Sequence, residues 1–256
     1  MAERNYVLGR GKVYFDRFAA GTRARTGERY LGNTPSFSLT VESEDLDHMS
    51  SDEGINVIDD SVLLSVSQSG EVAWDDINKD NLALFFLGEA VTVTQTATPV
   101  TGENLGTVQE DRYYQLGVTD ANPAGVRDVS AVALKQGATP LVEGTDYRLE
   151  AELARVYIPK GSAAAGKAVT ADYTPAAVSR DRVISGRESV YGALRFIAAN
   201  PKGKNVDYLM PYVKLSPNGD FSLKGDEWQQ GSFSIKIMEP AAGMPAIYAD
   251  GRPYTP

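Results

Sequence analysis

Very few residues of this chain could support acid–base or nucleophilic chemistry. The sequence contains no cysteine, and His48 is its only histidine. A thiol nucleophile, a disulfide framework and a cysteine or multi-histidine metal site are therefore excluded, and a serine–histidine–aspartate relay would have to use His48. Asp45 and Asp47 lie close to His48 in the sequence and could support an acid–base role. A single histidine among carboxylates is more often a surface residue, so we predict no catalytic role for it.

Two pairs of adjacent carboxylates are the next candidates. Asp59–Asp60 and Asp75–Asp76 could serve a glycoside hydrolase or bind calcium. Neighbouring residues of a strand point to opposite faces, and the sequence lacks the alternating oxygen ligands of a calcium loop. Asp76 is better explained as the cap of a helix. The pairs therefore predict neither a glycosidase nor a metal site.

A glycine-rich segment, residues 161–167, has the spacing of a phosphate-binding loop. It reads Gly-Ser-Ala-Ala-Ala-Gly-Lys, but Ala168 stands where a Ser or Thr must bind magnesium, and a strand pattern follows where a helix is required. A hairpin turn of small residues explains it better. The 13 Tyr, 8 Phe and 2 Trp could form a carbohydrate platform, yet most lie at alternating strand positions, where packing explains them. The sequence thus predicts a protein that is not an enzyme and has no cofactor.

Charge is distributed unevenly along the 256 residues. The net charge is −9, but residues 1–29 carry seven basic and three acidic side chains, whereas residues 30–78 contain no Lys or Arg. The eleven acids of the second segment are Glu42, Glu44, Asp45, Asp47, Asp52, Glu53, Asp59, Asp60, Glu71, Asp75 and Asp76. So much negative charge repels a phosphate backbone, which makes the segment a poor groove for gripping nucleic acid. A solvated face without a special role is the alternative interpretation.

The sequence offers no sign of a membrane segment. Residues 1–10 include Glu3, Arg4 and Arg10 with no apolar stretch after them, which argues against a secretory signal. No run of about 18 apolar residues occurs anywhere. We therefore expect the protein to be made in, and to stay in, an aqueous compartment.

Hydrophobic periodicity predicts a chain rich in strands. Period-2 patterns over residues 36–42 and 62–67 predict two strands, and the acidic stretch between them would form a long hairpin with its tip at residues 50–54. One short helix is expected, with Asp76 or Asn78 as its N-cap and Gly88 at its end. Further strands are expected at residues 12–18, 190–198, 208–215, 220–223 and 231–238.

The positions of the turn-forming residues glycine and proline predict the domain organisation. Short apolar segments between turn residues indicate a small inserted β-sandwich at residues 117–175, which divides a larger domain into residues 1–116 and 176–256. The sequence Ser-Pro-Asn-Gly at residues 216–219 predicts a hairpin turn. The tail from Pro240 onward, with four prolines, predicts an extended arm.

This order of elements resembles the major tail tube proteins of long-tailed, siphovirus-like bacteriophages. The shared features are a basic N-terminal segment, a strand, a long acidic hairpin, one short helix and returning strands. The segments that carry the resemblance are 11–15 (GKVYF), 30–37 (YLGNTPSF), 42–45 (ESED), 78–88 (NKDNLALFFLG), 113–117 (YYQLG) and 142–147 (VEGTDY). The last of these is similar to segments of inserted immunoglobulin-like modules.

The resemblance implies a fold, a function and a set of partners. The fold is a β-sandwich or half-barrel with one flanking helix and an inserted immunoglobulin-like β domain. The chain would form hexameric rings whose sheets join edge to edge around a lumen, and the rings would stack into the tail tube of a virion assembled in the host cytoplasm. Its partners would be other copies of itself, the tape measure protein and passing DNA in the lumen, and the tail terminator and distal tail proteins.

Two groups of residues are the candidates for these contacts. An acidic lumen would let DNA slide without sticking. The candidates for the lumen or for the contact between rings are Glu42, Glu44, Asp45, Asp47, Ser65, Ser67 and Glu71. The basic residues Arg23, Arg25 and Arg29 are candidates for an arm between subunits that contacts the acidic loop of a neighbouring ring.

Two rival interpretations remain open at this point. The first is a receptor-binding or glycan-binding virion or adhesin module, which would form a discrete monomer or trimer with measurable ligand affinity. The second is a glycoside hydrolase that uses carboxylates, in which changing single acids would abolish turnover.

Overall fold

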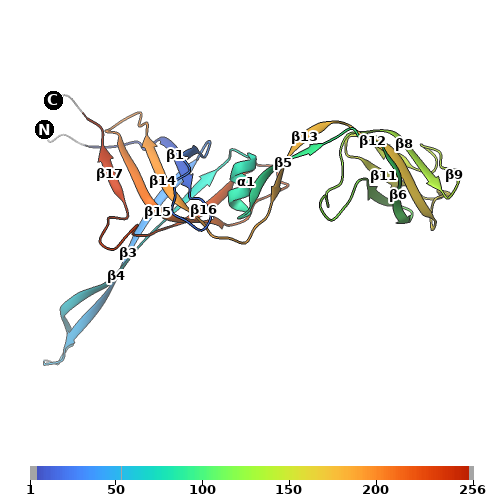
Figure 1. Cartoon of the computed structure of the whole chain (residues 1–256). Helices are drawn as coiled ribbons and strands as arrows, with labels where there is room; N and C mark the ends of the chain where they lie inside the picture. Colours follow the sequence, from blue (N-terminus) through green and yellow to red (C-terminus); the bar gives the residue numbers. More distant parts are fainter. Residues whose placement is uncertain (1–4, 53, 254–256) are drawn as a thin grey trace. The chain divides into compact units, whose positions relative to one another are not determined.

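The computed structural model describes residues 5–52 and 54–253, which form two compact units (Figure 1). The first unit comprises Met1–Val91 and Val183–Pro256, and the second comprises Thr92–Arg182. Strands account for 54% of the structure and helix for 3%, so the predicted mainly β class with a single short helix is confirmed for the described residues.

One antiparallel sheet forms the body of the first unit. Seven strands lie in the order β2–β1–β14–β15–β16–β4–β3, and β17 also pairs with β15. The bounds are β1 (Gly11–Arg17), β2 (Arg29–Tyr30), β3 (Ser36–Ser50), β4 (Val57–Trp74), β14 (Val190–Ala198), β15 (Val206–Asn218), β16 (Gly231–Ile237) and β17 (Tyr248–Gly251). Period-2 alternation sets the two faces: in β16, Phe233 and Ile235 are buried while Ser234 and Lys236 are exposed.

The hydrophobic core of the first unit lies on one face of this sheet, beside helix α1 (Lys79–Phe85). The Trp74 indole stacks on Phe233 and Phe221, with ring centroids 5.5 and 5.9 Å apart, and it meets Phe85 of α1 edge-on. Trp74 and Phe233 are fully buried. These contacts stabilise a seven-residue helix, which would be too short to form alone.

Of the two predicted N-terminal caps of α1, Asn78 is correct and Asp76 is wrong. The Asn78 side chain accepts hydrogen bonds from the backbone N–H groups of Asp80 and Asn81. The predicted end at Gly88 is wrong, because the helix ends at Phe85 and Leu87 adopts the left-handed conformation, with φ of 52°.

Two glycines mark the place where the chain leaves the first unit and returns to it. A Cβ on Gly88 would collide with the carbonyl oxygen of Ile184, and a Cβ on Gly186 would collide with the carbonyl oxygen of Leu87. Gly186 also donates its N–H to the carbonyl of Phe86 (3.0 Å). Gly88 therefore serves the close approach of two backbones. Its N–H also donates to the carbonyl of Ala83 (2.8 Å) and so satisfies one carbonyl at the end of α1.

The second unit contains two small sheets around their own core. One has the strand order β10–β11–β7 and the other β6–β12–β8–β9, while β5 and β13 form a two-stranded ribbon. The bounds are β5 (Glu89–Gln95), β6 (Val100–Thr107), β7 (Arg112–Gln115), β8 (Val129–Gln136), β9 (Thr139–Pro140), β10 (Arg148–Glu150), β11 (Arg155–Ile158), β12 (Ala168–Pro175) and β13 (Val178–Ile184). Fully buried Val156 and Ile158 of the first sheet share a core with Leu134 and Val169 of the second.

The inserted unit is larger than the sequence predicted. The expected boundaries were residues 117 and 175, whereas the structure places them at Thr92 and Arg182. The reason is strand pairing, since β6 pairs with β12 and β7 pairs with β11. Both β6 and β7 precede residue 117, and their partners lie far along the chain, where local patterns do not reveal them.

The predicted hairpin turn at residues 216–219 is wrong. Strand β15 continues through Asn218, which pairs with Ser232 of β16, and the chain returns only after a loop of residues 219–230. Residues 220–223, predicted as a strand, belong to this loop. Phe221 leaves the ladder because its ring packs between Trp74 and Phe85.

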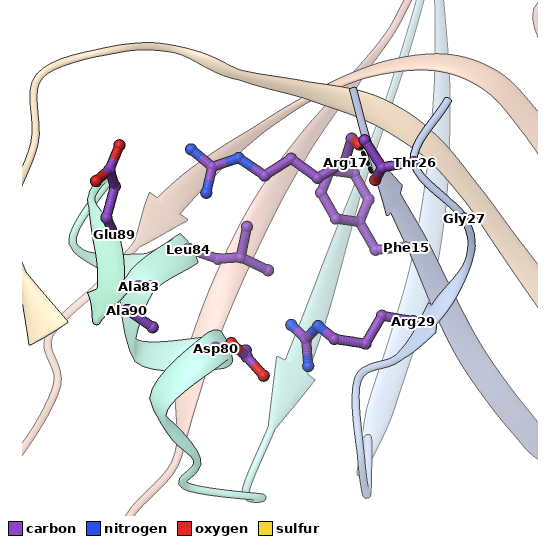
Figure 2. A pocket seen from close by; sticks show the side chains of 10 residues that line it. All are labelled: Phe15, Arg17, Thr26, Gly27, Arg29, Asp80, Ala83, Leu84, Glu89 and Ala90. Carbon is purple, nitrogen blue, oxygen red and sulfur yellow. Dashed lines mark hydrogen bonds between the residues drawn. The ribbon is translucent and has the colours of Figure 1, made fainter. Parts of the chain in front are cut away.

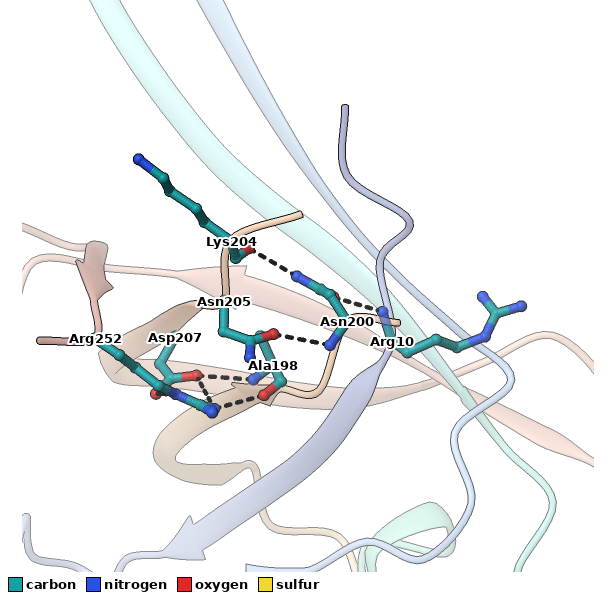
Figure 3. A network of polar contacts seen from close by, with 7 residues as sticks. All are labelled: Arg10, Ala198, Asn200, Lys204, Asn205, Asp207 and Arg252. Carbon is teal, nitrogen blue, oxygen red and sulfur yellow. Dashed lines mark hydrogen bonds and ion pairs between the residues drawn. The ribbon is translucent and has the colours of Figure 1, made fainter. Parts of the chain in front are cut away.

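The predicted C-terminal arm folds back onto the sheet instead of extending freely. Strand β17 pairs with the first half of β15, and Arg252 donates to the carboxylate of Asp207 (2.9 and 3.2 Å) (Figure 3). These hydrogen bonds hold the pKa of Asp207 below its usual value. The paired strand and the ion pair fix the described part of the tail.

Candidate functional site

The predicted long hairpin is present and extends past the neighbouring strands (Figure 1). β3 pairs with β4 from Ser36 to Ser50, whereas β16 pairs with β4 only from Gln68 to Trp74. Residues 42–50 and 57–67, here called the free hairpin, therefore pair only with each other within the described chain. Of the predicted tip, Glu53 lies outside the described residues, as do Glu3 and Arg4 of the N-terminal segment.

Five of the seven lumen candidates share one face of the sheet. Glu42 pairs with Ser67, Glu44 with Ser65, and Glu71 with Ser38, all in one unbroken register. Alternation places these side chains on the face opposite the core, here called the polar face. Asp45 and Asp47 alternate with Glu44 and so lie on the other face, the one that continues from the core. The acids of the hairpin therefore do not form a single row.

Hydroxyl groups satisfy several of the hairpin acids. Ser65 donates to Glu44 (3.2 Å), Ser61 donates to Asp47 (2.7 Å) and Ser43 donates to Asp45 (3.3 Å). His48 Nδ1 lies 2.5 Å from the carboxylate of Asp59. These pairs are exposed, and each links the two strands or neighbouring positions of one strand. They stabilise the register of the hairpin and explain His48 as a surface residue that contacts Asp59 on the facing strand.

The free hairpin also exposes apolar side chains that have no core to enter. Leu46, Val62, Leu63, Leu64 and Val66 are 51–60% exposed. Soluble proteins rarely expose so many large apolar residues on one element unless another molecule covers them. The hairpin therefore combines acidic and apolar groups on an element that stands apart from the core of its own unit.

The polar face is not purely acidic where it crosses the body of the sheet. Lys214 of β15 pairs with Lys236 of β16, and Lys236 pairs with Ser69 on the same face. Glu71 accepts a hydrogen bond from Ser232 (3.0 Å). The sequence analysis did not identify these two lysines. Their alternation with apolar neighbours such as Val213 and Ile235 could have placed them on the face opposite the core.

The three predicted arm arginines do not form a free arm. Arg23 donates to the carbonyl of Pro240, and its guanidinium lies 4.1 Å from the centre of the Tyr212 ring. Arg29 donates to the side chain of Asn81 (2.8 Å) and is half-buried. Arg25 forms a backbone bridge with Phe18. Two of the three side chains therefore stabilise the fold of their own chain.

A buried asparagine connects Arg29 to helix α1. Asn81 is fully buried; its amide donates to the carbonyls of Leu31 (2.8 Å) and Asp76 (2.9 Å), and its oxygen accepts from Arg29. Burial lowers the pKa of Arg29, while the charges of Asp80 and Asp76 oppose this shift. The cluster fixes α1 against the N-terminal strands.

We expect Asn81→Ala to lower the free energy of unfolding by about 2–3 kcal/mol, because two buried carbonyls and one guanidinium lose their partner. Asn81→Asp keeps an acceptor for Arg29, but its ionised carboxylate donates to neither carbonyl, so the free energy of unfolding should decrease in this variant as well. Urea denaturation followed by tryptophan fluorescence measures both. A loss below about 0.5 kcal/mol for Asn81→Ala would contradict this account of the cluster.

A hollow of about 400 Å³ lies next to this cluster but lacks catalytic geometry (Figure 2). Arg17 and Arg29 point into it from the N-terminal segment, and Asp80 faces Arg29 from the helix. Its hydroxyl group, on Thr26, donates to the carbonyl of Arg17 (2.6 Å), and the nearby Asp16 carboxylate accepts from the backbone N–H groups of Thr26 and Gly27 (both 2.9 Å). The hollow offers charge pairing around an apolar floor, not a reaction centre.

The remaining sequence motifs have structural explanations. Residues 161–167 form turns between β11 and β12, and no helix follows them. Asp75 accepts from Asn33 (2.7 Å), and Asp76 packs against Gly32. The described residues contain no group of three or more His, Asp or Glu side chains that could hold a metal ion. None of their helices has the length and apolar character needed to cross a membrane.

Comparison with protein families gives one match. Residues 6–242 match the model of the family described as Protein of unknown function UCP028589. The chain belongs to this family. The UCP028589 match reaches from the N-terminal strand to the segment after β16 and so spans both units. No curated protein matches the chain.

Sequence reasoning also missed an exposed aromatic residue outside the hairpin. Trp228, in the loop of residues 219–230, is 94% exposed, and Leu223 in the same loop is 80% exposed. A tryptophan within the polar run Asp226–Gln230 was the signal, since no alternating pattern places it in a core.

Proposed function

We propose that the chain is a structural subunit that assembles with copies of itself into hexameric rings, and that the rings stack into the tail tube of a virion through which DNA passes. The observation that carries this proposal is the free outer edge of β3. Within the described residues, this 15-residue strand pairs only with β4. Monomeric proteins normally avoid such an edge, because it is a template for pairing with another chain.

The opposite border of the same sheet is short and ends at β2, a strand of two residues that pairs with Tyr14 and Phe15 of β1. Neighbouring residues also cover β1, because Leu31 donates to the carbonyl of Val13 (3.0 Å) and Thr26 donates to the carbonyl of Arg17 (2.6 Å). Within the described chain no further strand pairs beyond β2, so the β3 edge of a neighbouring copy could join the sheet at this border. Closure into a ring then satisfies the backbone groups of both borders.

The free hairpin provides a second argument for self-assembly. Its apolar side chains, including Leu64 and Val66, would lose their exposure against a neighbouring subunit. Its acids would face either the lumen or a neighbour, and Glu42 and Glu44 on the polar face are the better lumen candidates. Their charge would repel phosphate and allow DNA to move.

Electron microscopy tests the proposal directly. We expect the purified chain at high concentration to show rings and stacked tubes in negative stain, and sedimentation velocity to show a mass that increases with concentration. A monomer at every concentration tested would contradict the proposal.

A second candidate function rests on an aromatic pair in the second unit. Tyr113 and Tyr157 lie with ring centroids 4.8 Å apart on one sheet, Arg155 covers the Tyr113 ring at 4.2 Å, and Tyr113 is 47% exposed. Exposed tyrosines beside a guanidinium could stack on a sugar ring, which favours glycan binding. Loss of glycan affinity on Tyr113→Ala in a discrete monomer or trimer would favour this candidate.

A further inference from the structure

The loop of residues 219–230 presents a tryptophan to solvent. Trp228 buries almost none of its surface, yet the base of the loop is anchored, because Phe221 stacks on the buried Trp74. Gln229 donates to the carbonyl of Ser222 (3.0 Å), and Ser222 donates to the carbonyl of Lys224 (3.0 Å). The loop is thus closed at its neck and held outward as a compact Ω-loop. An exposed aromatic side chain on an anchored loop is a suitable anchor for a protein interface, because the loop backbone has less conformational entropy to lose on binding.

The same unit has a hollow with an aromatic wall, of a size suited to such an anchor. Its volume is about 630 Å³, and its wall includes Phe37, Leu39, Phe196 and Tyr208. Phe196 lies between the other two rings, with centroids 5.9 Å from Phe37 and 6.3 Å from Tyr208. These side chains belong to the edge of the core and are only partly buried. The hollow is therefore an opening in the core through which aromatic surface remains accessible.

The charges of the loop and the hollow are complementary. Asp226 and Glu227 directly precede Trp228, while Arg10 lines the rim of the hollow. The backbone of Arg10 is fixed by Asn200 (2.9 Å), and Figure 3 shows its side chain pointing away from that polar network. Lys202 adds a second positive charge next to this segment, since it pairs with Leu8. The acids beside Trp228 would thus meet cations at the rim.

Two aromatic residues of the hollow differ in their distance from the loop. Tyr208 is near the beginning of β15, roughly 30 Å along the strand from Asn218, after which the loop begins. Phe37 is level with the end of β15, because it pairs with Val72, Val72 pairs with Phe233, and Phe233 pairs with Pro217. The loop and the hollow are different surfaces, so a contact that repeats from the loop of one copy to the hollow of the next is a head-to-tail contact, which leads to rings or stacks.

We propose that the Trp228 loop of one copy inserts into the hollow lined by Phe37, Phe196 and Tyr208 of the next copy. This contact deepens the self-assembly proposed above and rests on it. Trp228 fills the aromatic opening, Asp226 and Glu227 pair with Arg10, and the repetition of the contact sets the direction in which copies follow one another.

Two variants, one for each half of the contact, provide the test. Trp228→Ala removes the anchor and keeps the hollow, whereas Arg10→Glu repels the loop and keeps the anchor; both positions are exposed, so the fold should be unaffected. Each variant alone should associate at least 10-fold more weakly than the unaltered chain in sedimentation velocity. A mixture of the two variants should form heterodimers and no larger species. The intact loop of Arg10→Glu can bind only the intact hollow of Trp228→Ala, so no further copy can be added.

Tryptophan fluorescence provides an independent readout. Trp74 is buried in the monomer, so a blue shift of emission and loss of acrylamide quenching on association report Trp228. Unchanged association of Trp228→Ala, or a mixture that stays monomeric while the unaltered chain assembles, would overturn this inference and leave the proposed function standing. If the unaltered chain does not associate at all, both proposals are wrong.

Discussion

A chain whose free hairpin is removed should remain a folded monomer and lose self-assembly. Deletion of residues 45–64, with Asn-Gly joining Glu44 to Ser65, preserves the observed pairing of these two residues through a two-residue turn. The core of the first unit contains no residue from the deleted segment, so the melting temperature should change by only a few degrees. Assembly should be lost because the deletion removes most of the exposed apolar side chains of the free hairpin, leaving Val66, and shortens the 15-residue β3 edge to residues 36–44.

Sedimentation velocity and negative-stain microscopy measure this effect. The matched control is Ser65→Ala with Ser67→Ala, which alters two polar side chains of the same hairpin but keeps its backbone edge and its apolar residues. The control should still assemble. Tubes formed by the shortened chain would exclude the hairpin from the interface between subunits.

The charge of the polar face should decide whether assembled tubes retain DNA. In Glu42→Lys with Glu44→Lys, the charge of the polar face changes by +4 in every subunit. Lysines in a narrow bore bind phosphates and release counterions, so DNA should co-sediment with these tubes at low salt and dissociate as salt increases. Unaltered tubes should retain almost none.

The opposite face of the same hairpin offers a control of equal charge. Asp45→Lys with Asp47→Lys also changes the charge by +4, but alternation places both side chains away from the polar face. These tubes should retain no more DNA than unaltered tubes. Equal retention by the two variants would show that the polar face does not line the bore.

Local patterns were sufficient for the hairpin and the helix. Strict alternation around Phe37 and Leu39 located β3, and Asn78 followed by an apolar stripe located α1, because both signals depend on neighbouring residues alone. The turn at residues 216–219 was predicted wrongly for the opposite reason. Contacts of Phe221 with Trp74, about 150 residues away in the sequence, outweighed a strong local turn signal.

The candidate site, too, could be predicted from the sequence only in part. The run of acids was evident in the sequence, but its separation into two faces requires the register between β3 and β4, which depends on pairing. Likewise, Arg29 is one more cation in a basic segment until the structure places it on the buried amide of Asn81. The limits of the second unit depended on β6 and β7 finding partners beyond residue 150, which composition does not encode.

The glycine pair Gly88 and Gly186 has a consequence for how this chain can be altered. The outgoing and returning backbones touch there, so an excursion of about 90 residues begins and ends at nearly the same point of the first unit. A domain of another sequence whose termini lie close together could be inserted between these two backbones. The insertion would not disturb the sheet of the first unit. The first unit therefore offers an insertion site for a foreign domain, and each subunit of an assembled polymer would carry one copy of the inserted domain.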